Sequence, residues 1–201
     1  MFVHEVIAWC NGLITGWVAR ISRGETKDVV IDHELRGVTP EMIDRWWLLM
    51  GDTETYKLWH PRDHMEARME VREEGGRATF THCVLEKIGG IPSRMRIRLE
   101  DPDAVSIPRE YGHVVTSAVL DRKGVPYAWV QHQYEEMEGG TRMRSTFRIP
   151  ARAPGFFVKG LRKHNREEMG QFPVFLPGLL ERIDSQAQAG TENPTAWSGK
   201  D

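Results

Sequence analysis

His164 and Glu168 are the residues whose types and spacing most directly suggest chemistry. They stand four positions apart in a segment with helical periodicity, so both side chains leave the helix on the same side. An imidazole nitrogen and a carboxylate oxygen at this spacing can bind one divalent cation, and zinc accepts both ligand types. The alternative is a solvated pair on a charged helix face, because the surrounding residues are rich in charge. The pair alone leaves both interpretations open.

A second run of chemically capable side chains joins two histidines through a rigid proline. It reads Tyr56-Lys57-Leu58-Trp59-His60-Pro61-Arg62-Asp63-His64. Two imidazoles flanked by a tyrosine and a tryptophan are unusual for a simple loop and indicate a functional role. The alternative is a packed aromatic connection, in which His60 bonds to the backbone and His64 begins a strand. Both interpretations fit the residues.

The length and composition are those of an ordinary globular domain. At 201 residues, with 40% hydrophobic and 28% charged residues, the chain can bury a core without covalent staples. A formal net charge of −2 gives no reason to expect a nucleic-acid partner. Cys10 and Cys83 are the only cysteines, too few for a disulfide framework, so we expect a reducing, cytoplasmic location.

The stretch from residue 2 to residue 21 is fairly apolar, but His4, Glu5 and Asn11 interrupt it. A membrane span or a signal peptide requires an unbroken apolar run, and a signal peptide also requires a basic start. We therefore expect no membrane partner. Residues 1–28 are interpreted as a helical segment that packs on the domain or on the partner subunit of a homodimer, and the domain itself is expected over residues 29–184.

The middle of the chain predicts one helix followed by a run of strands. Thr39 suits the N-cap and Pro40 the first helical position, and the helix is expected to stop at Gly51. A short strand is expected before it, at residues 29–31. Further strands are expected at residues 66–71, 78–85, 94–99, 114–120, 128–134 and 143–149. This spacing indicates an antiparallel meander of five or six strands.

The C-terminal part of the sequence changes to a helical period. Residues 156–183 are expected to form a long helix, with Pro173 and Pro177 marking a kink or a break. Residues 185–201 are polar and are expected to form a loose tail. A curved antiparallel sheet wrapped on a long final helix is an α+β arrangement that encloses a cavity suited to a small molecule.

Six short strings between residues 30 and 182 carry a resemblance to a known family. They are Met42-Ile43-Asp44-Arg45-Trp46-Trp47, the run from Tyr56 to His64, Glu86-Lys87-Ile88-Gly89-Gly90, Arg96-Ile97-Arg98 before Glu100-Asp101-Pro102, the string from Gly140 to Phe147, and the His164 to Glu168 pair. Together they resemble the diacetylphloroglucinol (DAPG) hydrolase family. The run around Trp59-His60-Pro61 is the most specific of them.

The resemblance implies a helix-grip fold of the START or lipid-transfer type with a catalytic zinc inside the cavity. The family's metal site uses two histidines and two glutamates. The four matching positions are His64, Glu86, His164 and Glu168. Glu86 is assigned because it precedes the Ile-Gly-Gly turn, and Glu100 is the alternative.

The resemblance also implies the reaction and two catalytic residues. Family members cut the carbon–carbon bond between an aryl ring and an acyl group, so the implied substrate is a small phenolic or polyketide-like ketone. Tyr56 and His132 are the expected residues for the phenolic oxygen and for the proton that the ring carbon needs, with His113 as the alternative to His132. A bound zinc acts as a Lewis acid and lowers the pKa of its water towards ~7.

Two other functions remain compatible with the sequence. One keeps the metal and the fold but carries out a cyclisation or another carbon–carbon rearrangement, because the same Lewis acid serves both reactions. The other is a metal-free binding module with an apolar cavity, because a fold does not fix a function. In each case four bulky side chains are expected as cavity walls or core: Trp46, Trp47, Trp59 and Phe147. The arginines at positions 96, 98, 142 and 144 are expected on solvated strand faces.

Overall fold

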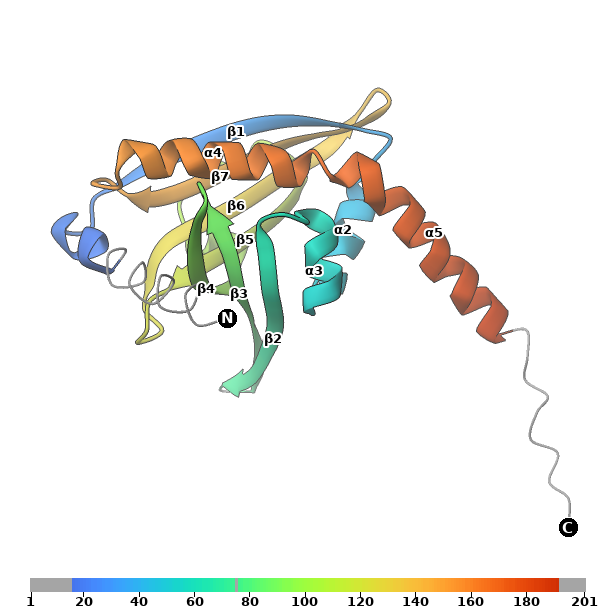
Figure 1. Cartoon of the computed structure of the whole chain (residues 1–201), viewed down its shortest axis with the longest axis horizontal. Helices are drawn as coiled ribbons and strands as arrows, with labels where there is room; N and C mark the ends of the chain where they lie inside the picture. The colour runs from blue at the N-terminus through green and yellow to red at the C-terminus, as the bar shows by residue number, and fades with distance from the viewer. Residues whose placement is uncertain (1–15, 75, 192–201) are drawn as a thin grey trace, which may run out of the picture.

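The computed structural model describes residues 16–74 and 76–191, and its centre is one curved antiparallel sheet (Figure 1). The strands pair in the order β1-β7-β6-β5-β4-β3-β2, so β2 to β7 form a meander and β1 joins it beside β7. The strands are β1 (Thr26–Arg36), β2 (His64–Glu74), β3 (Arg77–Ile88), β4 (Ile91–Glu100), β5 (His113–Leu120), β6 (Pro126–Met137) and β7 (Gly140–Pro150). The predicted α+β helix-grip class is confirmed.

β1 is much longer than the sequence predicts. The expected strand covers three residues, whereas β1 has 11 residues and pairs with β7 from Thr26 to Arg36. The buried residues are Val29, Ile31 and Leu35, and the residues between them are exposed or half-buried. Because this outer face is polar, a search for apolar runs detects only a short part of the edge strand. β1 therefore crosses the expected boundary at residue 28. Of the predicted N-terminal helical segment, residues 16–21 are helical and residues 1–15 lie outside the described chain.

Two short helices precede β2, and both begin at a side-chain cap. α2 (Pro40–Leu49) has Thr39 as its N-cap, whose hydroxyl accepts a hydrogen bond from the Met42 amide at 3.3 Å, as expected. α3 (Thr53–Trp59) begins after Asp52, whose carboxylate accepts from two backbone amides. α3 is not predicted from the sequence, because its seven residues are too few to display a helical period.

Two helices take the place of the single C-terminal helix expected from the sequence: α4 (Gly155–Met169) and α5 (Phe172–Thr191). In Figure 1, α4 lies along the sheet beside β1, while α5 extends away from the body of the domain. α4 therefore carries the long helix of the helix-grip arrangement, and α5 contributes mainly its first turns to the core.

The prolines do not cause the break between these helices. The helical pattern is interrupted at Gly170, the C-cap of α4. Pro173 lies in the first turn of α5, where a proline is tolerated, and Pro177 lies inside the helix. α5 also continues to Thr191, so the beginning of the expected loose tail is helical, and residues 192–201 lie outside the described chain.

A close backbone contact holds α4 against the turn between β3 and β4. Gly89 in this turn has a φ of +61°, a conformation that favours glycine. A Cβ atom added to Gly160 of α4 would lie 2.7 Å from the Gly89 Cα, closer than real Cβ atoms approach. Two glycines therefore allow α4 to pack directly on the hairpin that also carries Glu86.

The buried apolar side chains form two clusters. One packs α2, α3 and the start of α5 on the sheet, and its rings of Trp46, Trp59 and Phe172 have centroids 5.7 to 6.1 Å apart. The other packs α4 on β7 through Leu161 and Phe147. Both helix groups are thus fixed to the same sheet, and this arrangement determines where their polar side chains meet.

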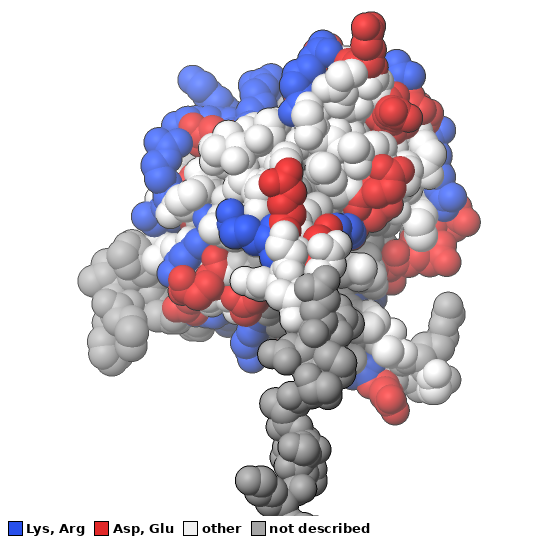
Figure 2. Space-filling model, turned by 90° about the vertical axis from the view of Figure 1, so that its right-hand side faces the viewer, with Lys and Arg blue, Asp and Glu red and all other residues white. Residues whose placement is uncertain are grey.

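The outer surface carries charges of both signs. Acidic and basic side chains are interspersed over the face seen in Figure 2. Arg142 and Arg144, expected on a solvated face, pair across strands with Glu135 at 2.6 Å and Asp32 at 2.7 Å. Such exposed pairs contribute little to stability individually. Among the described residues, no helix is both long enough and apolar enough to span a bilayer.

Candidate metal centre and ligand cavity

A cavity of about 930 Å³ lies between the inner face of the sheet and the helices. Its walls are mainly apolar and aromatic, and they include three of the four bulky residues expected there, namely Trp47, Trp59 and Phe147. Trp46 is fully buried in the core instead. The polar and charged side chains in the lining include Asp44, Tyr56, His82, Glu86, His132, His164 and Glu168. An apolar space with a few polar groups suits a small organic ligand.

Four predicted metal ligands come together at the wall of this cavity. His64 is the first residue of β2 and pairs in register with Glu86 on β3. His164 and Glu168 project from α4 towards the same point, as their four-residue spacing requires. All four side chains are buried. The folded sheet and helix therefore unite residues separated by about 100 positions in the sequence.

The nitrogen–oxygen distances within this group exceed those of hydrogen bonds and are close to the spacing of ligands around one metal ion. Nε2 of His64 lies 3.5 Å from Glu86 Oε2 and 3.6 Å from Glu168 Oε2. Nε2 of His164 lies 3.7 Å from Glu86 Oε1 and 3.6 Å from Glu168 Oε2. These separations exceed the usual hydrogen-bond range, whereas neighbouring donors on a tetrahedral zinc with bonds near 2.0–2.1 Å lie about 3.3–3.4 Å apart.

Five buried imidazole nitrogens have no hydrogen-bond partner among the described residues, and two of them face the carboxylates of this group. These two are Nε2 of His64 and Nε2 of His164, which lie near Glu86 and Glu168. A buried polar atom without a partner is costly, and a cation between the four side chains would satisfy both nitrogens. The donor set of two imidazoles and two carboxylates fits zinc. The residues present therefore fit the metal that the sequence resemblance implies.

Three of the four side chains are also held by hydrogen bonds to residues outside this group. Nδ1 of His64 contacts the backbone carbonyl of Tyr56 at 3.0 Å, which places its proton on Nδ1 and leaves Nε2 for the metal. The Tyr56 hydroxyl donates to Glu86. The Asn165 amide donates to Glu168 Oε1 at 2.8 Å. Such outer partners orient ligands before the metal binds.

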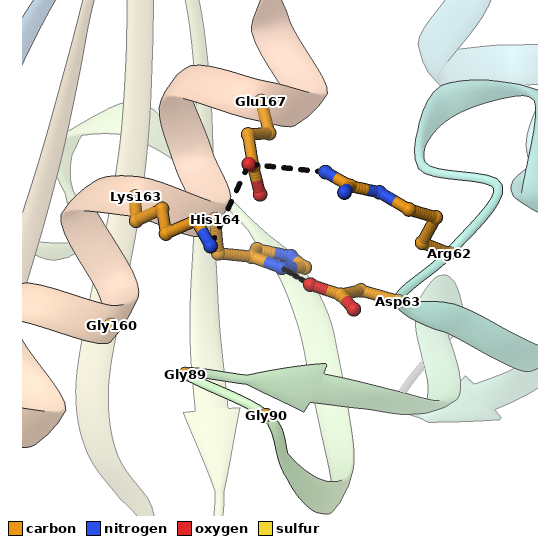
Figure 3. A pocket seen from close by; sticks show the side chains of 8 residues that line it. All are labelled: Arg62, Asp63, Gly89, Gly90, Gly160, Lys163, His164 and Glu167. Carbon is orange, nitrogen blue, oxygen red and sulfur yellow. Dashed lines mark hydrogen bonds and ion pairs between the residues drawn. The ribbon is translucent and has the colours of Figure 1, made fainter.

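The fourth outer partner is Asp63, which approaches His164 from the side opposite the cavity. Asp63 Oδ2 lies 3.5 Å from His164 Nδ1, at the edge of a small pocket of about 170 Å³ (Figure 3). The His60 ring stacks on the His164 ring at 4.8 Å, and its Nε2 lies 3.5 Å from Glu167 Oε2. Glu167 points outwards and also binds Arg62, in keeping with its different position on the helical period.

The electrostatics of the cluster favour charged carboxylates. Burial opposes ionisation of Glu168, but its contacts with His64, His164 and Asn165 hold the pKa of this carboxyl at about 2. Burial likewise opposes protonation of His164, but Glu86, Glu168 and Asp63 raise the pKa of its imidazole above the ordinary value. Buried anions facing imidazoles in this way form a site with a strong preference for a cation.

The members of two pairs of alternatives left open by the sequence lie in different places. Glu86 lies in the cluster, whereas Glu100 lies at the end of β4 and pairs with Arg98. His132 lines the cavity, whereas His113 binds Asp44 at 2.9 Å near the surface.

Nε2 of His60 has no hydrogen-bond partner among the described residues and faces the carboxylates of Asp63 and Glu167. His64 does begin a strand, as the interpretation of the run from Tyr56 to His64 as a packed connection expects.

Sequence reasoning gives no role to three polar residues near the site. Asp63 and His60 belong to the recognised run, but nothing in their spacing shows that they face a helix 100 residues later. His33 on β1 reaches Asn165 with its Nε2 at 3.0 Å. Its alternation with Ile31 and Leu35 is the signal that would have placed it on the inner face of the sheet.

The fold and the cavity define a helix-grip protein. The structure of Ara h 8.0201 matches with a TM-score of 0.51 at 11% identity, over 77% of this chain and 99% of that one. Protein Ms6760 from Mycobacterium smegmatis matches with a TM-score of 0.45 at 20% identity, over 77% and 98% of the two chains.

The family follows from the sequence itself. The profile described as DAPG hydrolase PhiG domain matches residues 13–155, and the protein belongs to this family, as the sequence strings predict. The match ends at the start of α4, so it does not include His164 and Glu168. A phloretin hydrolase from Eubacterium ramulus is 25% identical over 175 residues, and the alignment spans 71% of this chain and 63% of that enzyme.

Proposed function

We propose that the protein is a zinc-dependent hydrolase that cleaves the carbon–carbon bond between the aromatic ring and the acyl group of a small phenolic or polyketide-like ketone. The main support is the convergence of His64, Glu86, His164 and Glu168 at the wall of a large apolar cavity. Family membership and the phloretin hydrolase relative support the same reaction class. With only two cysteines the chain suits a cytoplasmic enzyme.

The net reaction adds one water molecule across the aryl–acyl bond. The acyl carbon gains the hydroxyl and leaves as a carboxylic acid, and the ring carbon gains the hydrogen. When bound by the four side chains, zinc would supply a Lewis acid for the ketone and lower the pKa of a water towards ~7. A ring carbanion is a poor leaving group, so the protein must also hold a proton donor near the ring.

The chain's own residues account for binding and for that proton. Trp47 and Trp59 offer aromatic walls to the substrate ring, and the apolar lining limits water to the polar end of the cavity. The Tyr56 hydroxyl lies at that end against Glu86, and His132 lies in the wall stacked on Trp47. We assign these two side chains to the phenolic oxygen and to delivery of the proton.

The test combines metal analysis with product analysis. The purified chain is expected to contain one zinc and to release a carboxylic acid from phloretin or from acylphloroglucinols. His164→Ala should lose both zinc and activity, while His113→Ala, a histidine outside the cavity, should keep both. Full zinc content and activity in His164→Ala would refute the metal assignment. A rearranged product without acid would instead indicate a cyclase-type reaction, and a metal-free protein a binding module.

A further inference from the structure

A line of hydrogen bonds leads from the candidate metal centre to the cavity wall. The Asn165 amide donates to Glu168 Oε1 at 2.8 Å, and Asn165 Oδ1 lies 3.0 Å from His33 Nε2. The same His33 nitrogen lies 3.4 Å from Ser145 Oγ, which in turn lies 2.9 Å from His132 Nδ1. The line crosses α4, β1, β7 and β6, where Ser145 stands directly opposite His132.

The first hydrogen bond orients the Asn165 amide and thereby the donor role of His33. The Glu168 carboxylate is an acceptor, so Asn165 must turn its NH₂ group towards it and its Oδ1 towards His33. His33 must then donate through Nε2–H. Ser145 Oγ can accept from the same Nε2–H at 3.4 Å, and its single hydroxyl proton can then be donated to His132 Nδ1 at 2.9 Å. In this assignment every hydrogen bond of the line has a donor and an acceptor.

This assignment fixes the state of the His132 ring. His132 is buried, and burial lowers its pKa to about 4, so the imidazole is neutral near pH 7 and carries one proton. With Ser145 donating to Nδ1, that proton is on Nε2. The ring lies in the cavity wall and stacks on Trp47 at 5.3 Å with an 11° angle between the planes, which fixes its orientation.

We propose that Asn165, His33 and Ser145 act as positioning residues that make His132 a hydrogen-bond donor to the cavity through Nε2–H. The subsite beside Trp47 then takes an oxygen of the ligand that accepts, such as a ketone oxygen or a phenolate. The phenolic nature of that ligand rests on the proposed function, but the protonation state of His132 does not. In a hydrolase, His132 would bind the substrate oxygen, and proton delivery to the ring carbon would belong to Tyr56.

The tautomer of His132 is directly measurable in the zinc-loaded full chain. With ¹⁵N-labelled histidine, NMR near pH 7.5 should show His132 protonated at Nε2 and unprotonated at Nδ1. Ser145→Ala should abolish this preference, and Ser145→Thr, which keeps the hydroxyl, should restore it. Protonation at Nδ1 in the unaltered protein would overturn the proposal, and this measurement depends on neither turnover nor the folding of a variant.

Ligand binding gives a second readout. The probe is 2,4,6-trihydroxyacetophenone, with quenching of tryptophan fluorescence as the signal. Ser145→Ala should weaken binding about 5- to 10-fold, the effect of one hydrogen bond, while Ser185→Ala, which alters an exposed serine on α5 outside the cavity, should bind normally. Equal affinity in Ser145→Ala and the unaltered protein would count against the proposal. If acid release fails while the Nε2–H tautomer is found, the proposed function is wrong and this inference stands.

Discussion

The Asp63 carboxylate and the carboxylates of Glu86 and Glu168 contact opposite sides of the His164 ring. Asp63 Oδ2 lies 3.5 Å from Nδ1, while Nε2 faces Glu86 and Glu168. A carboxylate behind a ligating histidine fixes the tautomer and raises the basicity of the nitrogen that binds the metal. This contact joins the residue before β2 to α4 outside the cavity.

Replacement of Asp63 should therefore weaken zinc binding without unfolding the protein. We expect Asp63→Ala to raise the zinc dissociation constant about 10- to 100-fold, because His164 loses its outer partner. The Asp63 backbone carbonyl still accepts from Lys87, so the local chain path should persist. Competition with a chromophoric chelator measures the change. Asp103→Ala, an exposed aspartate in the turn after β4, should leave zinc affinity unaltered, and an unaltered affinity in Asp63→Ala would show that the contact is not functional.

The contact between Gly160 and Gly89 predicts a second effect on the metal site. Gly160→Ala would place a methyl group 2.7 Å from the Gly89 backbone, so α4 must move away from the hairpin. Overpacking of this kind costs about 1–3 kcal/mol, and the shift should also displace His164, one turn further along α4. Urea unfolding and zinc titration measure the two consequences.

The matched control is Gly155→Ala at the start of the same helix. A Cβ atom there has no neighbour within 4 Å, so the substitution should be neutral or slightly stabilising. Normal stability and normal zinc affinity in Gly160→Ala would mean that the helix position does not depend on this contact.

Much of the fold follows from local patterns, and the exceptions have physical causes. The strands from β2 to β7 alternate clearly and are separated by turns, so they could be predicted within a few residues. The full length of β1 could not be predicted, because its outer face is polar and its partner β7 is the last strand in the sequence. α3 is too short for a helical period, and α5 continues through Pro177 because its first turns pack on Trp46.

The candidate site divides in a similar way. The α4 pair is a local signal, since four residues of helix fix its geometry, whereas Glu86 could be named only by resemblance and not distinguished from Glu100 by spacing. The pairing of His64 with Glu86 across β2 and β3 is a tertiary fact of register. The sequence gives even less indication of the contacts made by Asp63, His33 and Asn165, because these contacts form only where α4 crosses the sheet.

The buried histidines predict how stability depends on pH. Burial lowers the pKa values of His82 and His132 to about 4, below the ordinary value of 6.5. Between these values the unfolded chain binds more protons than the folded chain. The stability is therefore fully present above pH 6.5 and falls as the pH drops towards 4, by about 1.4 kcal/mol per pH unit for each histidine.

Substitution by a neutral residue isolates this contribution. In chelator-treated protein, His132→Gln should reduce the slope of unfolding free energy against pH by about one proton, and the His82→Gln, His132→Gln double variant by about two. Urea unfolding at several pH values between 7 and 4.5 gives the slopes. Parallel curves for the unaltered protein and the double variant would show that these imidazoles are not held neutral.

Tyr56 combines two roles that one substitution can separate. Its backbone carbonyl accepts from His64 Nδ1, while its hydroxyl donates to Glu86. Tyr56→Phe keeps the first contact and removes the second. We therefore expect the variant to retain one zinc per chain while kcat for acid release falls about 100-fold or more, the usual range for loss of a positioned acid.

Zinc stoichiometry and kcat must be measured on the same preparation, because only their divergence distinguishes proton delivery from metal binding. Tyr111→Phe is the matched control, since that ring lies near the surface under Arg142 and should affect neither quantity. Loss of zinc together with activity in Tyr56→Phe would make the hydroxyl a support for Glu86 alone. Full activity with zinc retained would remove Tyr56 from the reaction and leave the ring proton to come from water.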